Sequence, residues 1–299
     1  MNGFRIALRC EAFIALHTFS SKLIVLAPSL VVVLQFLLLR LTEASRSARD
    51  RLLSNPSFDE IVANNAYGYY VDGLSTGLTM LGLLLVAQAA YSFSFDRDIQ
   101  TARHLLIRRV SRPSLIMAKL LHLHILGALS CLFLIVIAYL MSSLFWEFGA
   151  IVEDGFELIS EEEIRSEITT GLRLALIPLP TAIAFGVFIS VCAQSATQAV
   201  TTALGITLAI DIFKTTLGDF AYYVYASFQP SLIDQSYLQD VSRLVRGYSD
   251  VLIDERVMLL NNWVPLPALL IFIGGALWLC LLYTSPSQRE ATLYRKQYS

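Results

Sequence analysis

The sequence predicts an all-α integral membrane protein with six transmembrane helices. Hydrophobic residues make up 56% of its 299 residues and charged residues only 15%. Its mean hydropathy is +0.61, and soluble domains do not combine these values. Apolar stretches of about 20 residues recur along the chain, which is the length that a helix needs to cross a bilayer core of about 30 Å. No linker rich in Pro, Gly or Ser marks a second domain, so residues 1–299 are expected to form one membrane domain.

Residues 1–21 precede the first span and predict an amphipathic helix. Phe4, Ala7, Leu8 and Glu11 recur at helical spacing, with Arg5 and other cations beside them. Such a helix lies on the cytoplasmic surface of the membrane. The alternative is a cytosolic extension of the first span.

Six apolar stretches are long enough to be spans. The fourth and fifth are separated only by residues 194–198, which predicts a helical hairpin with a short turn. The six stretches are residues 23–39, 74–93, a part of 120–145, 172–193, 199–217 and 263–283.

The charges of the loops predict the orientation of the spans, because Lys and Arg accumulate in short cytoplasmic loops. The loop between the second and third spans is basic, whereas the loop between the third and fourth spans is acidic. The basic loop and its flank contain Arg97, Arg103, Arg108, Arg109, Arg112 and Lys119, and the acidic loop contains Glu147, Glu153, Asp154, Glu157, Glu161, Glu162, Glu163 and Glu167. Both termini are therefore expected in the cytoplasm.

Three external segments are expected to contain helices. Between residues 41 and 73, the pairs Asn55-Pro56 and Asn64-Asn65 predict breaks between short helical pieces. Ser160 and Glu163 have the spacing of a capping box, which predicts a helix that begins near Glu161.

The longest external segment, residues 218–262, contains a second amphipathic pattern. Ser236 and Gln239 repeat the capping-box spacing. This helix either packs on the protein's own external face or binds a periplasmic partner. Its apolar positions are Leu238, Val241, Val245, Tyr248 and Leu252.

No catalytic or metal-binding motif is present in the sequence. A P-loop is absent as well, so any ATP must be bound by another chain, and no cofactor is expected on this one. The four cysteines are scattered and predict neither a disulfide nor a metal site. Asp211 and Lys214, three residues apart, either pair inside the fifth span or contact water at its external end.

The basic loop carries an ordered set of residues that resembles a known family. Asp96-Arg97-Asp98 is followed by Thr101, Leu105-Leu106, Val110-Ser111-Arg112 and Lys119. This order is similar to the loop of ABC-2-type transporter permeases, in which an acidic-Arg-acidic triplet precedes Gly-Thr, Leu-Leu, Pro-Val-Ser-Arg and a final Lys. Two positions depart from it, because Gln100 stands where the family usually has Gly and Arg109 where it usually has Pro.

The resemblance implies a permease subunit in a bacterial cytoplasmic (inner) membrane. It further implies a second permease copy, with a homodimer expected, and two cytoplasmic P-loop ATPase subunits that hold ATP and Mg²⁺. Residues 96–116 would contain a coupling helix that docks on the ATPase. The expected docking residues are Asp96, Arg97, Asp98, Thr101, Leu105, Leu106, Arg109 and Arg112. Alternatively, these arginines only set the topology and bind anionic lipid head groups.

The expected function is therefore the export or translocation of a substrate that the sequence does not identify, with ATP hydrolysed by a separate subunit. The chain itself is not expected to be an enzyme, and its near-neutral net charge of -2 gives no reason to expect a nucleic-acid partner. The alternative function is that of a mechanotransmission subunit, which drives a periplasmic protein through residues 218–262 without passing a solute.

Overall fold

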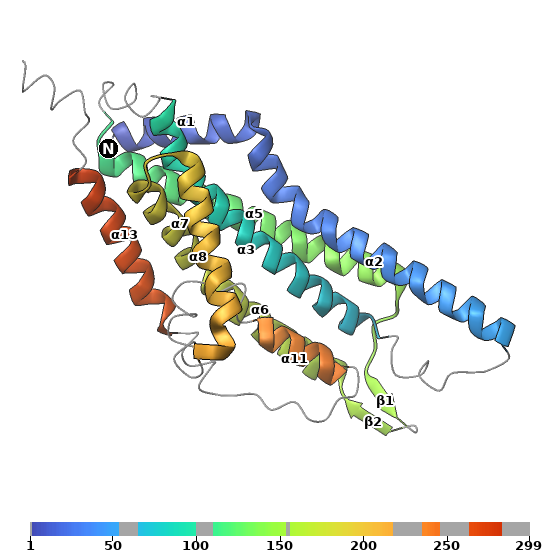
Figure 1. Ribbon diagram of the computed structural model, residues 1–299. Coiled ribbons are helices and arrows are strands. Elements are labelled where there is room, and N and C mark those ends of the chain that lie inside the picture. Colours follow the sequence, from blue (N-terminus) through green and yellow to red (C-terminus); the bar gives the residue numbers. More distant parts are fainter. Residues whose placement is uncertain are drawn as a thin grey trace, which may run out of the picture.

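The computed structural model describes residues 2–53, 65–99, 110–153, 156–217, 235–245 and 263–282. This part of the chain is a bundle of long helices with one short β-hairpin (Figure 1). Its elements are α1 (Asn2–His17), α2 (Phe19–Leu53), α3 (Ala66–Asp98), α5 (Arg112–Phe145), β1 (Ile151–Glu153), β2 (Phe156–Ile159), α6 (Glu161–Leu176), α7 (Leu179–Cys192), α8 (Ala196–Leu217), α11 (Gln235–Val245) and α13 (Pro265–Leu282).

Four helical stretches of the described chain are long and apolar enough to cross a membrane, judged by length and composition. Two shorter apolar helices, Ala196–Ile210 within α8 and Pro265–Leu281 within α13, lie where the fifth and sixth spans are expected. The six-span layout therefore stays a prediction. The four longer stretches are Phe19–Arg49, Ala66–Asp98, Arg112–Phe145 and Glu161–Cys192, of which the last contains both α6 and α7.

The helices α2 and α3 extend well beyond their predicted spans. α2 continues for 35 residues to Leu53, because residues 40–53 contain no Gly or Pro and many good helix formers. α3 begins at Ala66, where the side-chain oxygen of Asn65 accepts a hydrogen bond of 3.0 Å from the Tyr67 amide. The predicted break at Asn64-Asn65 agrees with the start of α3 at Ala66. The expectation of short helical pieces is wrong for residues 41–53 and 66–73, which belong to two long helices, and residues 54–64 lie outside the described residues.

The prediction of an all-α fold misses one antiparallel hairpin, which joins α5 to α6. Val152 pairs with Glu157 across β1 and β2. Two of the three residues of β1, Ile151 and Val152, are β-branched. The Asp154-Gly155 sequence that follows is one that tight hairpin turns favour. The chain then enters α6 at Glu161, where Ser160 Oγ accepts a 3.2 Å hydrogen bond from the Glu163 amide. The predicted helix start near Glu161 and the cap by Ser160 are confirmed here.

The predicted N-terminal helix is present as α1. It lies across one end of the bundle and is set at an angle to α2 (Figure 1). α1 packs on α5 and buries Ala7 and Glu11, while Phe13, Leu16 and the adjoining Phe19 are exposed. This division into a buried and an exposed face agrees with the predicted amphipathic pattern. Its position relative to a membrane surface stays a prediction.

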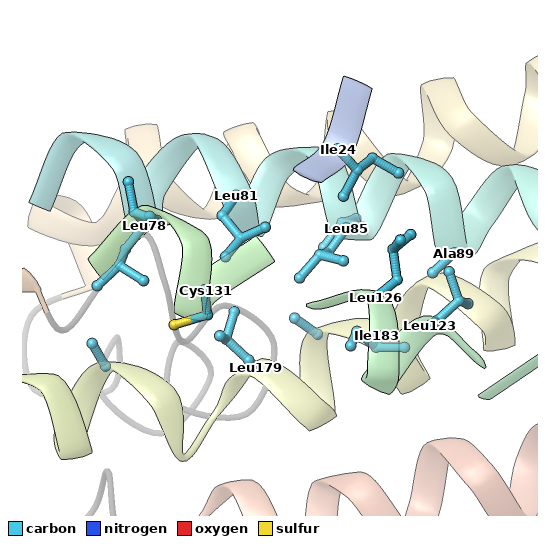
Figure 2. Packing of buried hydrophobic residues seen from close by; sticks show 14 of the residues in the cluster. Ile24, Leu78, Leu81, Leu85, Ala89, Leu123, Leu126, Cys131, Leu179 and Ile183 are labelled. Atoms are coloured by element: carbon cyan, nitrogen blue, oxygen red, sulfur yellow. The ribbon is translucent and has the colours of Figure 1, made fainter. Parts of the chain in front are cut away.

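The core is organised around α3, which contacts α2, α5, α7, α8 and α11. Leu78, Leu81 and Leu85 of α3 pack among side chains of α5 and α7 (Figure 2). α7 makes its closest approach at Gly186, where an added Cβ would lie 2.6 Å from Ala89 Cβ and 2.8 Å from the carbonyl oxygen of Val86. Only glycine permits this backbone contact, so position 186 determines how closely α7 can pack against α3.

The amphipathic helix predicted in residues 218–262 is present as α11, which packs on α3 and α6. It begins at Gln235, so Ser236 lies in its first turn and not before it. Ser242 Oγ donates a 2.6 Å hydrogen bond to Asp72 Oδ1 of α3, and the Tyr237 hydroxyl donates one to Glu167 of α6. Burial raises the pKa of Tyr237, and its hydrogen bond to Glu167 adds to this effect. The phenol therefore remains a protonated donor at neutral pH.

Candidate functional site between α3 and α5

The junction between α3 and α5 contains the residues that the sequence singles out. α3 ends at Asp98 and α5 begins at Arg112, and residues 100–109 lie outside the described part of the chain. Ser111 caps α5, because its side-chain oxygen accepts a 3.3 Å hydrogen bond from the Ser114 amide. Val110 just before it is buried. The chain on both sides of the junction is therefore anchored in the bundle.

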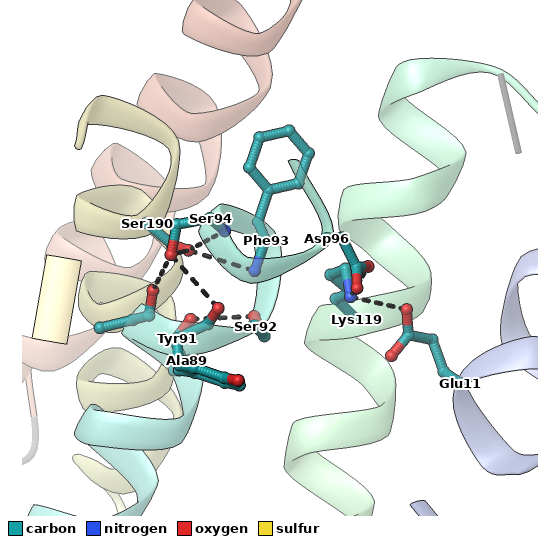
Figure 3. Close-up of polar contacts among 10 residues, drawn as sticks. Glu11, Ala89, Tyr91, Ser92, Phe93, Ser94, Asp96, Lys119 and Ser190 are labelled. Carbon is teal, nitrogen blue, oxygen red and sulfur yellow. Dashed lines mark hydrogen bonds and ion pairs between the residues drawn. The ribbon is translucent and has the colours of Figure 1, made fainter. Parts of the chain in front are cut away.

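Asp96 takes part in a buried ion cluster that joins three helices. Lys119 Nζ of α5 lies 2.5 Å from Asp96 Oδ2 and 2.7 Å from Glu11 Oε1 of α1 (Figure 3). The Lys119 side chain is only 3% exposed, and those of the two acids are 9% exposed. Charges buried to this degree are tolerated only when they are paired. The cluster thus holds the end of α3 to both α5 and α1.

Arg97 and Asp98 reach in another direction, to the turn between α7 and α8. A guanidinium N–H of Arg97 donates to the carbonyl oxygen of Ala193, which follows the last residue of α7. Asp98 Oδ2 accepts a 2.8 Å hydrogen bond from the amide of Ala196, the first residue of α8. A carboxylate at a helix N-terminus satisfies a free amide and interacts favourably with the helix dipole. The predicted short turn between the two helices is present, and Arg97 and Asp98 stabilise it.

The three consecutive side chains contact different neighbours because successive residues of an α-helix are rotated by about 100°. Asp96 faces α5 and α1, whereas Arg97 and Asp98 face the ends of α7 and α8. We call Glu11, Asp96, Arg97, Asp98 and Lys119 the junction cluster. It connects the last turn of α3 to four other helices.

The α5 side of the junction has one further link. Arg112 Nη1 donates a long hydrogen bond of 3.5 Å to the carbonyl oxygen of Cys280 in α13. α13 also packs along α7 and α5. The beginning of α5 is consequently connected to the last described helix of the chain.

Four of the eight expected docking residues lie in the described part of the chain. Asp96 is buried, and Arg97, Asp98 and Arg112 form hydrogen bonds within the chain. These contacts within the chain were not part of the expectation of a docking surface. Asp98 is nevertheless exposed and Arg97 and Arg112 are half-buried, so docking at these residues stays a prediction. Thr101, Leu105, Leu106 and Arg109 lie outside the described residues.

The other sequence-predicted sites have separate locations. Asp211 and Lys214 lie in the C-terminal half of α8, and their side chains are outside the described part. Leu238, Val241 and Val245 are buried against α3 and α6, so a partner would have to displace α11 to reach them. Of the two interpretations of this apolar face, the geometry fits packing on the protein itself. Tyr248 and Leu252 lie outside the described residues.

The sequence offered a signal for part of the junction cluster. Glu11 stands on the apolar face of its helix, four residues after Ala7, and Lys119 lies at the start of a long apolar run. An ionisable residue at such a position is expected to have a buried partner. The contacts of Arg97 and Asp98 with the turn after α7 had no such signal, because their partners are backbone groups.

The junction cluster links helices through ion pairs and hydrogen bonds. Its polar groups are ion-paired or hydrogen-bonded within the chain. In the described residues, no three His, Cys, Asp or Glu side chains are grouped so as to hold a metal ion.

Comparison with protein-family models, curated proteins and solved structures finds no match for this chain.

Proposed function

We propose that the chain is the membrane subunit of an ATP-driven transporter and that a separate P-loop ATPase acts on the segment between α3 and α5. The observation that supports this most directly is the junction cluster, in which the last turn of α3 contacts α1, α5, α7 and α8. A push on the adjoining segment would therefore move five helices together. The order of residues from Asp96 to Lys119, similar to that of ABC-2-type permeases, suggests where the push comes from.

In this proposal, the junction cluster converts a local displacement into a rearrangement of the bundle. Buried ion pairs and short hydrogen bonds are suited to this, because packed elements of this kind shift between discrete arrangements instead of deforming continuously. Two copies of the chain with two ATPase subunits would form the transporter. The substrate would pass between inward-open and outward-open arrangements as the ATPase subunits close and open.

The alternative, a mechanotransmission subunit that drives a periplasmic protein, depends on an exposed apolar face in the external segment. Leu238, Val241 and Val245 would supply most of that face, and they are buried within the chain. We therefore favour the transporter.

Exchanging the charges of Arg97 and Asp98 tests the proposal. In Arg97→Asp with Asp98→Arg, a carboxylate faces the Ala193 carbonyl and a guanidinium faces the Ala196 amide, so two acceptors meet at one contact and two donors at the other. The stimulation of ATP hydrolysis by the membrane subunit is expected to be lost, leaving the basal rate of the ATPase. The measurement is the ATPase rate of the complex that co-purifies from native membranes, reconstituted in lipid.

A matched exchange serves as the control. Glu161 and Arg165 form an ion pair of 2.6 Å along α6, and Glu161→Arg with Arg165→Glu keeps the opposite charges together. This variant is expected to retain stimulated hydrolysis. Unchanged assembly and unchanged stimulation in the Arg97 and Asp98 exchange would contradict the proposal, as would the absence of any P-loop ATPase from the purified complex.

A further inference from the structure

Ser190 of α7 forms an unusual contact with the backbone of α3 just before the junction cluster. Its side-chain oxygen accepts two hydrogen bonds from consecutive amides, 3.1 Å from the nitrogen of Phe93 and 2.9 Å from that of Ser94 (Figure 3). A hydroxyl oxygen has two lone pairs and can accept both. Ser190 is fully buried, so water does not compete for these amides.

The carbonyl groups that normally pair with these two amides also have other partners. In a regular α-helix, the amides of Phe93 and Ser94 donate to the carbonyl oxygens of Ala89 and Ala90. Here the Ser92 hydroxyl donates to the Ala89 oxygen and the Ser94 hydroxyl to the Ala90 oxygen, each at 2.9 Å. Both donors and both acceptors of two successive rungs thus have an additional side-chain partner.

The close approach at Gly186 makes this contact feasible. An added Cβ at Gly186 would lie 3.2 Å from the Ala90 nitrogen as well as close to Val86 and Ala89. Ser190 follows four residues later on the same face of α7, one turn further along α3. The missing side chain at 186 therefore allows the hydroxyl at 190 to reach the α3 backbone.

We propose that α3 has a hinge between Ala89 and Ser94 and that Ser190 is the positioning residue that stabilises its bent form. Helices bend where a side chain enters their hydrogen-bond ladder, and buried amides remain in such a bend only if another acceptor satisfies them. Figure 1 shows the final turns of α3, beside α1, set at an angle to the long remainder of the helix. The hinge lies directly before Asp96–Asp98, so the junction cluster turns with the shorter arm. The hinge is a property of this chain alone and does not depend on the proposed function.

Distances between spin labels on the two arms test the hinge. Thr76 of α3 and Ile99, which directly follows α3, are exposed, and 23 residues of straight helix would separate them by about 35 Å. Labels at these positions are introduced into a chain whose cysteines Cys10, Cys131, Cys192 and Cys280 are replaced, and the protein is studied in lipid nanodiscs. Wild-type Ser190 is expected to give a distance shorter than the straight-helix value. Ser190→Ala should shift the distribution to a longer and narrower one, because the Phe93 and Ser94 amides then have only the carbonyl groups of α3 as acceptors.

Two further variants show whether a changed label distance in Ser190→Ala comes from the hinge or from a general loss of packing. Ser130→Ala removes another fully buried hydroxyl, which donates to Ile24 of α2 at 2.8 Å, and it should leave the distance unchanged. Ser190→Thr keeps the acceptor oxygen and should retain the wild-type distance. An Ala variant with the wild-type distance, a Thr variant that behaves like Ala, or an equal shift in Ser130→Ala would each overturn the proposal.

The hinge also has a test that does not require Ser190 to be changed. The double variant Ser92→Ala with Ser94→Ala removes the two hydroxyls that donate to the carbonyl oxygens of Ala89 and Ala90. It also removes the Ser94 hydroxyl oxygen, to which Ser190 Oγ donates at 3.3 Å, while the Ser190 oxygen remains an acceptor. The double variant is expected to lengthen the same label distance and to slow hydrogen exchange of the Phe93 and Ser94 amides. An unchanged distance together with unchanged exchange would overturn the proposal even if Ser190→Ala failed to fold.

Discussion

Lys119→Met is expected to destabilise the protein more than any other single change described for the junction cluster. The substitution keeps the length and apolar stem of the side chain but leaves the carboxylates of Glu11 and Asp96 buried without their cation. Removing one partner of a buried ion pair typically lowers the free energy of unfolding by about 3 to 5 kcal/mol. The expected result is a large decrease in the thermal unfolding midpoint, measured in the same lipid or detergent for both proteins.

A triple variant identifies the cause of this loss. Glu11→Gln, Asp96→Asn and Lys119→Met together remove all three charges while they preserve approximate side-chain volumes. Neutral replacements of a whole buried ion group are often tolerated, so the triple variant should recover most of the stability that Lys119→Met loses. If it is no more stable than Lys119→Met, the loss comes from packing around position 119 and not from the unpaired acids.

Gly186→Val is expected to have the second largest effect. The added Cβ would meet Ala89 Cβ at 2.6 Å, the Val86 carbonyl oxygen at 2.8 Å and the Ala90 nitrogen at 3.2 Å. Two of these atoms belong to the α3 backbone and cannot rotate away, so α7 must move outward. Overpacking of this kind lowers the free energy of unfolding by about 3 kcal/mol, which exceeds the gain of a few tenths of a kcal/mol to be expected from replacing a helical glycine. Denaturation monitored by Trp fluorescence or circular dichroism checks the expectation.

The same substitution at Gly205 provides the matched control. Gly205 lies in α8, and nothing stands within 4 Å of an added Cβ. Gly205→Val should therefore leave the unfolding midpoint nearly unchanged. A loss at Gly205 as large as the loss at Gly186 would mean that the α3 contact is not the cause.

Much of the helical layout follows from local signals in the sequence. The capping spacing of Ser160 and Glu163 predicts the start of α6, and the short polar stretch 194–198 predicts the turn between α7 and α8. The lengths of the helices could not be predicted as well from the sequence. Hydropathy marks only the apolar part of a helix, whereas α2 and α3 continue into polar sequence because nothing there stops them. The hairpin of β1 and β2 was missed because strands of three and four residues leave a weak pattern.

The junction cluster could be predicted only in part, because most of its contacts join residues that are far apart in the chain. The positions of Asp96, Arg97 and Asp98 were identified, but their partners were not: Asp98 binds an amide 98 residues away. Which residues lie opposite the triplet depends on how α7 and α8 pack, and that packing depends in turn on Gly186. A pattern within one segment does not contain this information.

Successive helical residues are rotated by about 100°. The number of residues before the last turn of α3 therefore matters as much as their identity, because it sets the direction in which each side chain points. Inserting one residue between Ser94 and Asp96 would turn the whole triplet by that angle and bring each side chain toward a neighbour of the wrong chemistry. Asp96 would leave Lys119, and Arg97 and Asp98 would lose the carbonyl and the amide that they now bind. A point substitution in this turn affects a single contact, whereas an inserted or deleted residue disrupts all three contacts at once. An evolving lineage can therefore exchange residues here far more readily than it can gain or lose one.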